Sequence, residues 1–128
     1  MTPEQRFIHW LRPIFPNDAD YCRIENVVGV GVPDINVCYR GREVWIEAKY
    51  VYDELPQIRK AQYAWGMRRA SVGGNVYVLG ELQDGMVCAW KYPFIGKPYR
   101  TQDKYVIPPQ MYDKLLEKDE VFNYLFPG

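Results

Sequence analysis

Three charged side chains in the first half of the chain have the types and spacing to hold a divalent cation. Asp34 opens one alternating segment, and Glu47 and Lys49 lie two residues apart in the next. Because side chains of a strand point to alternate faces, Glu47 and Lys49 share a face, about 7 Å apart. A turn at residues 40–42 predicts a hairpin that brings Asp34 within reach of both. Two carboxylates and an ammonium group on one sheet face indicate a divalent-metal site with an attendant cation.

The elements that must position these side chains can be read from the periodicity of the chain. Apolar residues alternate through 34–39 and 43–50, which predicts two paired strands. Residues from Pro56 to about Ser71 then predict a helix, and the continuous apolar run 76–79 predicts a buried central strand. Residues 86–91 predict a further strand, joined to that one as a hairpin.

The two ends of the chain predict helices that cover this sheet. Thr2, Pro3 and Gln5 form a capping-box pattern, and apolar residues follow it at helical spacing as far as Ile14. A strand is expected at residues 22–28. Residues 92–109 predict an irregular segment, and the pattern from Gln110 onward is helical again.

The ordered set of motifs resembles the PD-(D/E)XK nuclease superfamily, in its VRR-NUC and Holliday-junction-resolvase-like branch. Pro33-Asp34 corresponds to the PD, and Glu47-Ala48-Lys49 corresponds to the (D/E)XK. Glu25 precedes the PD where many members carry a further acidic residue, and Gln62 lies where this branch carries a glutamine. The resemblance implies a restriction-endonuclease-like α/β fold. Its core would be a central mixed sheet flanked by helices in the order αβββαβ, within a single domain.

The same resemblance implies a metal-dependent DNA endonuclease. Asp34, Glu47 and the main-chain oxygen of Ala48 would bind Mg²⁺ or Mn²⁺. Lys49 would orient the attacking water or stabilise the transition state, and Gln62 would position the water or a phosphate. The third acidic residue is Glu25 or Glu4, although an acidic residue in the first turn of a helix also favours the helix end by itself.

Three other functions fit parts of this pattern. A site-specific homing or restriction endonuclease would use the same fold, and a catalytically inert DNA- or protein-binding module could also be built on it. A third reading is purely structural: Asp34, Glu47 and Lys49 would then form an ion-pair ladder on a surface hairpin. The preferred DNA form, whether a junction, a nick or a defined sequence, is left open by the sequence.

Two groups of basic residues are candidates for DNA contact. Arg59, Gln62 and Arg69 recur on one face of the predicted helix, together with the small residue Gly66. Lys97 and Arg100 are interleaved with aromatic residues in the segment 92–109. The first group could equally be a solvated helix face, and the aromatic residues of the second could simply anchor a loop to the core.

Composition limits the partners. The chain has 128 residues, 48% of them hydrophobic, and 16 basic residues balance 16 acidic ones. A neutral chain is not an indiscriminate polycation, so DNA binding requires basic side chains gathered on one surface. The three cysteines form no CxxC pair, which disfavours zinc and a disulfide framework and favours the cytosol. No membrane-spanning segment or signal peptide is expected. A phage or mobile-element origin and a homodimer that cuts both strands are further expectations.

Overall fold

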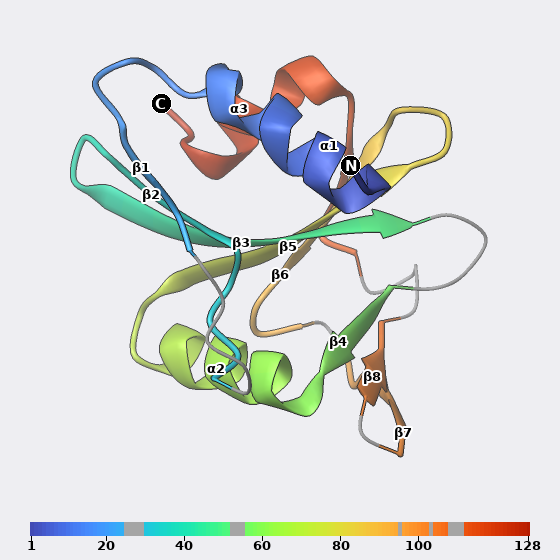
Figure 1. Ribbon diagram of the computed structural model, residues 1–128. Coiled ribbons are helices and arrows are strands. Elements are labelled where there is room, and N and C mark those ends of the chain that lie inside the picture. The colour runs from blue at the N-terminus through green and yellow to red at the C-terminus, as the bar shows by residue number, and fades with distance from the viewer. Residues whose placement is uncertain (25–29, 52–55, 95, 103, 108–111) are drawn as a thin grey trace.

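The chain is built around a six-stranded mixed sheet with helices on both faces (Figure 1). The computed structural model describes residues 1–24, 30–51, 56–94, 96–102, 104–107 and 112–128. The strands of this sheet are β1 (Asp20–Arg23), β2 (Ile35–Tyr39), β3 (Arg42–Val51), β5 (Asn75–Leu82), β6 (Val87–Lys91) and β9 (Lys114–Leu116). The helices are α1 (Pro3–Leu11), α2 (Lys60–Ser71) and α3 (Val121–Leu125), with 3-10 turns at Arg12–Ile14 and Lys118–Glu120.

The strands lie in the order β1-β2-β3-β5-β6-β9. β3 and β5 are parallel, and α2 lies in the connection between them, whereas the other neighbours are antiparallel. The predicted αβββαβ core is therefore confirmed, with α1, β1, β2, β3, α2 and β5 as its elements. None of the described helices is long and apolar enough to cross a membrane.

The hairpin of β2 and β3 forms because its turn residues accept an unusual backbone conformation. The two residues between the strands, Arg40 and Gly41, have φ angles of 49° and 80°. Two consecutive positive φ angles are typical of the type I′ turn, whose twist matches that of paired strands. The turn fixes the register, in which Ile35 pairs with Ile46 and Val37 pairs with Val44.

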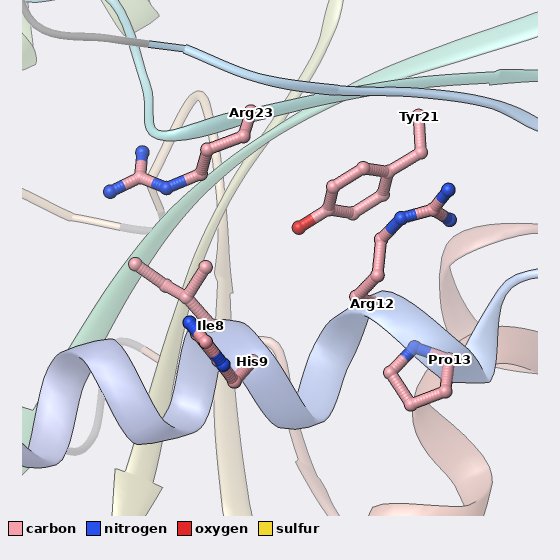
Figure 2. A pocket seen from close by; sticks show the side chains of 6 residues that line it. All are labelled: Ile8, His9, Arg12, Pro13, Tyr21 and Arg23. Carbon is pink, nitrogen blue, oxygen red and sulfur yellow. The ribbon is translucent and has the colours of Figure 1, made fainter.

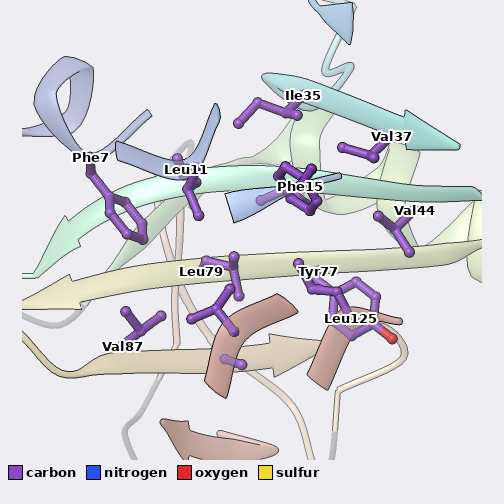
Figure 3. Packing of buried hydrophobic residues seen from close by; sticks show 14 of the residues in the cluster. Phe7, Leu11, Phe15, Ile35, Val37, Val44, Tyr77, Leu79, Val87 and Leu125 are labelled. Atoms are coloured by element: carbon purple, nitrogen blue, oxygen red, sulfur yellow. The ribbon is translucent and has the colours of Figure 1, made fainter. Parts of the chain in front are cut away.

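The face of the sheet that α1 and α3 cover is an apolar core (Figure 3). Val44, Ile46 and Ala48 of β3 point into it, since they alternate with the residues of the opposite face. The helix α1 begins as predicted: the Gln5 N–H donates to Thr2 Oγ1 at 3.2 Å, and the Thr2 N–H donates to Gln5 Oε1 at 2.8 Å. Other members of this core are Phe7, Leu11, Phe15, Ile35, Val37, Tyr77, Leu79, Val87, Ala89, Leu116, Val121 and Leu125.

The opposite face carries α2 and a second, three-stranded sheet. That small sheet has the order β4-β8-β7, with β4 at Gln57–Arg59, β7 at Tyr99–Thr101 and β8 at Lys104–Val106. Figure 1 shows it beside the beginning of α2. Apolar residues of α2 and of the small sheet pack against this face of the main sheet and form a second core. Its members include Ile58, Trp65, Val76, Val78, Cys88, Trp90, Tyr92, Phe94 and Ile107.

The strand expected at residues 22–28 is observed as β1 from Asp20 to Arg23, and residues 25–28 of that prediction lie outside the described part of the chain. Three further boundaries differ from those predicted. The helix expected from Pro56 begins at Lys60, because residues 57–59 pair with β8 instead. The segment 92–109, expected to be irregular, contains the hairpin of β7 and β8. The helix expected from Gln110 is replaced by β9 followed by the short helix α3. In each case a strand of three residues pairs with a distant segment, and so short a segment shows no clear alternation of its own.

Candidate metal-binding active site

Asp34 and Glu47 are buried next to each other on the α2 side of the main sheet. Ile35 pairs with Ile46, so extending the register by one residue places Asp34 opposite Glu47. Both residues are nearly enclosed, at 8% and 6% exposure. Buried carboxylates are rare unless they are paired or bind a metal, so this pair is a candidate functional site.

Asp34 is held by contacts to both neighbouring strands. Its Oδ2 accepts the main-chain N–H of Ala48 at 2.9 Å. On its other side the Arg23 guanidinium of β1 donates to the main-chain oxygen of Asp34 at 2.9 Å and lies 3.7 Å from Oδ1. The carboxylate is thereby aimed along the sheet toward Glu47, and its position depends on the strands rather than on a loop.

Gln62 of α2 holds Glu47 from the other layer. Its Nε2 donates to Glu47 Oε1 at 2.8 Å, and its Oε1 accepts the main-chain N–H of Arg59 at 2.7 Å. Because a main-chain N–H can only donate, the amide oxygen must face Arg59, which fixes the amide group toward Glu47. Gln62 was predicted to contact water or phosphate; here its side chain is 8% exposed and orients Glu47.

The proximity of two carboxyl groups changes the acidity of Glu47. Burial, a hydrogen bond with Asp34 and the negative charge of Asp34 together raise the pKa of Glu47 to about 9. The positive charges of Lys49 and Arg59 act in the opposite direction and only partly compensate. The pair therefore retains a proton at neutral pH unless another cation takes its place.

A divalent cation fits the oxygen atoms gathered here. Asp34 and Glu47 offer two carboxylates, and the main-chain oxygen of Ala48, also expected to be a ligand, belongs to a residue that contacts Asp34. The third acidic residue is not decided: Glu25 lies outside the described residues, and Glu4 is exposed on α1. Within the described part of the chain, no third acidic, histidine or cysteine side chain lies within 4.8 Å of both carboxylates.

Gly31 brings the segment before Asp34 against the first turn of α2. Its φ is +78°, and a Cβ atom there would lie 2.1 Å from the main-chain oxygen of Ala61. No side chain can be placed at that distance, so only glycine lets this segment approach α2 so closely. The approach places Asp34 near the helix that carries Gln62.

The predicted DNA-contacting residues do not form one surface. Arg59 lies beside the carboxylates, since its charge acts on the pKa of Glu47. Arg69 stacks on Trp45 and Trp65, with its Cζ 5.1 Å and 4.6 Å from the two ring centroids. Gly66, expected to admit a partner, is covered by the Tyr92 ring. The face of α2 that carries these residues thus packs largely inside the protein, and DNA contact by Arg59 and Arg69 stays a prediction.

Lys97 and Arg100 are exposed near the small sheet, on the segment leading into β7 and within it. No described contact ties either side chain to the carboxylate pair. Their role in DNA binding stays a prediction.

A groove with cationic walls lies beside Arg23. It encloses about 320 Å³ between α1 and β1 and is lined by Ile8, His9, Arg12, Pro13, Tyr21 and Arg23. Figure 2 shows Tyr21 and Arg23 facing the α1 residues across it. The Arg12 guanidinium lies 4.4 Å from the centre of the Tyr21 ring. Its described lining includes two guanidinium groups and no carboxylate, so an anion would be attracted there.

Two residues at the site were not identified from the sequence. Arg23 lies just before the PD motif, and its guanidinium donates hydrogen bonds to the main-chain oxygens of Ile24 and Asp34. Hydrogen bonds to main-chain oxygens cannot be predicted from the spacing of residue types. Tyr92 is buried close to Glu47: burial and then the charge of Glu47 raise its pKa. Only the folding of β6 onto α2 reveals that proximity.

Comparison with known proteins identifies the fold. No protein-family model matches the chain, and no curated protein matches it. Among solved structures, it is similar to the 1.6 Å structure of Hjc, a Holliday junction resolvase from the archaeal hyperthermophile Archaeoglobus fulgidus. The identity is 17%, the match covers 93% of this chain and 99% of that one, and the TM-score is 0.62. The chain has the restriction-endonuclease-like α/β fold that its motifs predict.

Proposed function

We propose that this protein is a metal-dependent endonuclease that hydrolyses phosphodiester bonds in DNA. The observation that carries the proposal is the buried pair of Asp34 and Glu47, hydrogen-bonded to Ala48 N–H and to Gln62. A structural ion-pair ladder would place these groups at the surface, where each is solvated. Burial of two adjacent carboxyl groups instead carries an electrostatic cost that a bound cation removes.

The residues of the chain would divide the chemistry among them. Bound Mg²⁺ or Mn²⁺ would supply an activated water and offset the phosphate charge. Asp34, Glu47 and the Ala48 oxygen would hold the ion, and Gln62 would keep Glu47 in position. Lys49, two residues after Glu47 on the same strand face, would stabilise negative charge on the phosphate. It would act through its fixed positive charge rather than as the general base.

Branched DNA is the substrate class that the likeness favours. The similar solved structure is that of a Holliday junction resolvase. The groove beside Arg23 adds a cationic surface next to the site, which suits a phosphate backbone. One site per chain cuts one strand, so a symmetric homodimer would be needed to cut two strands together. The origin of the protein in a phage or mobile element stays a prediction.

The test is cleavage of a panel of labelled DNAs by the purified protein. A four-way junction, a nicked duplex, a continuous duplex and a single strand of the same sequence should be incubated with Mg²⁺, with Mn²⁺ and with EDTA. We expect metal-dependent cuts, most rapid on the junction, that the Glu47→Gln variant does not make.

Each of the other outcomes would favour a different function for this protein. Cleavage of the continuous duplex at one defined sequence would favour a homing or restriction endonuclease. Binding of DNA without cleavage under any metal condition would identify an inert binding module. Equal cleavage by wild type and Glu47→Gln would show that the proposed site is not the catalytic one.

A further inference from the structure

The small three-stranded sheet presents two unlike faces. Its register pairs Arg59 with Lys104 and Ile58 with Tyr105 in β4 and β8, and it pairs Tyr99 with Val106 in β7 and β8. Because cross-strand partners point to the same face, two sets separate. The inner set includes Ile58 and Tyr105. The outer face, as used below, consists of Gln57, Arg59, Tyr99, Lys104 and Val106.

The inner set fixes which way this sheet is turned. Ile58 is completely buried, and the Tyr105 ring lies 4.2 Å from the Tyr63 ring of α2. The outer face must then point away from the core. Tyr99 is 59% exposed on the outer face. Arg100 pairs with Tyr105 and is also exposed at the edge strand β7, so the orientation of the sheet rests on Ile58 and Tyr105. An exposed aromatic ring offers an apolar stacking surface, whose burial against a partner is favourable.

The outer face leads directly to the candidate active site. Arg59 ends β4 and immediately precedes α2, and its main-chain N–H is bonded to Gln62, which in turn holds Glu47. The positive charge of Arg59 acts to lower the pKa of Glu47. From Arg59 the face continues across Lys104 of β8 and reaches Tyr99 on β7. No described residue of the face is acidic.

We propose that the outer face of this sheet binds the DNA strand leaving the active site, with Tyr99 stacking on an unpaired base. Arg59 and Lys104 would contact successive phosphates, because cations along a groove track the backbone and an exposed aromatic ring accepts any base. The inference rests on the proposed nuclease function and specifies its substrate: DNA with unpaired nucleotides beside the cut. In a continuous duplex the bases are stacked inside, so Tyr99 finds none to contact.

The experiment measures binding separately from cleavage. Fluorescence anisotropy in EDTA should compare a duplex bearing a single-stranded flap with the continuous duplex of the same sequence. We expect Tyr99→Ala to weaken flap binding about 10-fold while leaving duplex binding unchanged. Tyr99→Phe, which keeps the ring, should bind like the wild type. Tyr112→Ala, which removes another exposed tyrosine next to β9, is the matched control and should change neither affinity.

A base analogue gives a second readout. With 2-aminopurine in the flap, stacking should quench the fluorescence in wild type and Tyr99→Phe, and Tyr99→Ala should abolish the quenching. Equal losses on flap and duplex, no loss on either, or the same loss in Tyr112→Ala would overturn the inference. Failure of the nuclease proposal would look different: no cleavage with any metal, whatever the flap-binding result for Tyr99.

Discussion

The two faces of strand β3 show how one element can serve stability on one side and chemistry on the other. Ile46 points into the core beneath α1, where its neighbours are apolar. Glu47, the next residue, points toward α2, where its partners are Gln62 and Asp34. Because successive residues of a strand point to opposite faces, one residue of sequence separates the two environments.

The polar face of β3 costs folding free energy, because it buries carboxyl groups. Asp34, Glu47 and Gln62 are all less than 10% exposed, and two of them are carboxyl groups next to each other. Each finds hydrogen-bond partners there, which limits the cost of burial. The negative charge of Asp34 still raises the pKa of Glu47, so the pair gives up its last proton only at high pH. The same face also buries the Trp90 indole N–H, which has no partner among the described residues. We infer that the apolar face supplies the larger share of stability, and that the polar face is retained for its function.

The largest effect should come from adjacent substitutions on the two faces. Glu47→Gln should lower the cleavage rate by about 1,000-fold, equivalent to several kcal/mol of transition-state stabilisation, because a metal ligand is lost. Ile46→Ala should lower the free energy of unfolding by about 2–5 kcal/mol, because it leaves a cavity in the core. Single-turnover cleavage and urea unfolding of both variants would measure the two effects.

The contrast between these two variants is itself the control. Glu47→Gln should unfold at the same or a higher urea concentration than wild type, and folded Ile46→Ala should still cleave. If Glu47→Gln lost stability and Ile46→Ala lost only activity, the assignment of the two faces would be wrong.

Lys49 sharpens the chemistry of the polar face. Lys49→Met, of similar length but uncharged, should slow the chemical step about 100-fold while metal and DNA still bind, because a fixed charge near the phosphate is removed. Single-turnover cleavage should be followed across pH with saturating metal. A rate that rises through an inflection near neutrality, present in wild type and absent in the Met variant, would instead make Lys49 the general base.

Substitution of Gly31 tests whether the close approach of its segment to α2 positions Asp34. Gly31→Ala should reduce cleavage about 100-fold, because a Cβ 2.1 Å from the Ala61 oxygen pushes the Asp34 segment away from α2. Gly41→Ala is the matched control. Gly41 also has a positive φ, of +80°, but a Cβ there meets nothing within 4 Å.

Both glycine variants should show the strain of a positive φ in thermal unfolding. Only Gly31→Ala should also lose activity. Equal activity of the two variants would mean that the approach of this segment to α2 does not position the site.

Arg59 and Arg69 separate DNA contact from packing on the α2 side. Arg59→Ala should weaken DNA binding about 5-fold and reduce the slope of log affinity against log salt by about 1, as expected for one phosphate contact. Arg69→Ala should mainly lower stability, by about 1 kcal/mol, because its guanidinium stacks on Trp45 and Trp65. Salt titrations of binding and thermal unfolding of each variant would decide. An unchanged salt slope in Arg59→Ala would place the backbone contacts elsewhere.

The last test of the polar face is the pH dependence of stability without metal. The pKa of Glu47 is about 9 in the folded protein, against an ordinary value of 4.5. Between these pH values the unfolded chain has released the proton and the folded chain has not, so stability must fall as pH rises. We expect the free energy of unfolding in EDTA to fall from pH 5 to 8, by at most about 1.4 kcal/mol for each pH unit.

Glu47→Gln should flatten this dependence, and Glu43→Gln, which alters an exposed residue of the same strand, should leave it as in wild type. Stability that rises with pH in the metal-free wild type would contradict the raised pKa.

The sequence by itself determined the elements whose signals are local. The alternation in 43–50 placed Glu47 and Lys49 on one face, because the side-chain period of a strand needs no knowledge of its neighbours. The turn at residues 40–42 predicted the hairpin that brings Asp34 next to Glu47. The capping box at Thr2 and Gln5 likewise fixed the start of α1. The order of the core elements followed from the motifs and is the order found.

Tertiary structure alone decided what depends on distant partners. Gln62 could have faced solvent or phosphate, and only the packing of α2 on β3 turned it onto Glu47. Arg69 shares its helical face with Gln62 in sequence, and only the tertiary structure shows that its guanidinium lies over Trp45 and Trp65. The strands β4, β8 and β9 have three residues each, too few to show a period, and exist because remote segments complete their hydrogen bonds. The equally short β7 pairs only with β8, as a hairpin.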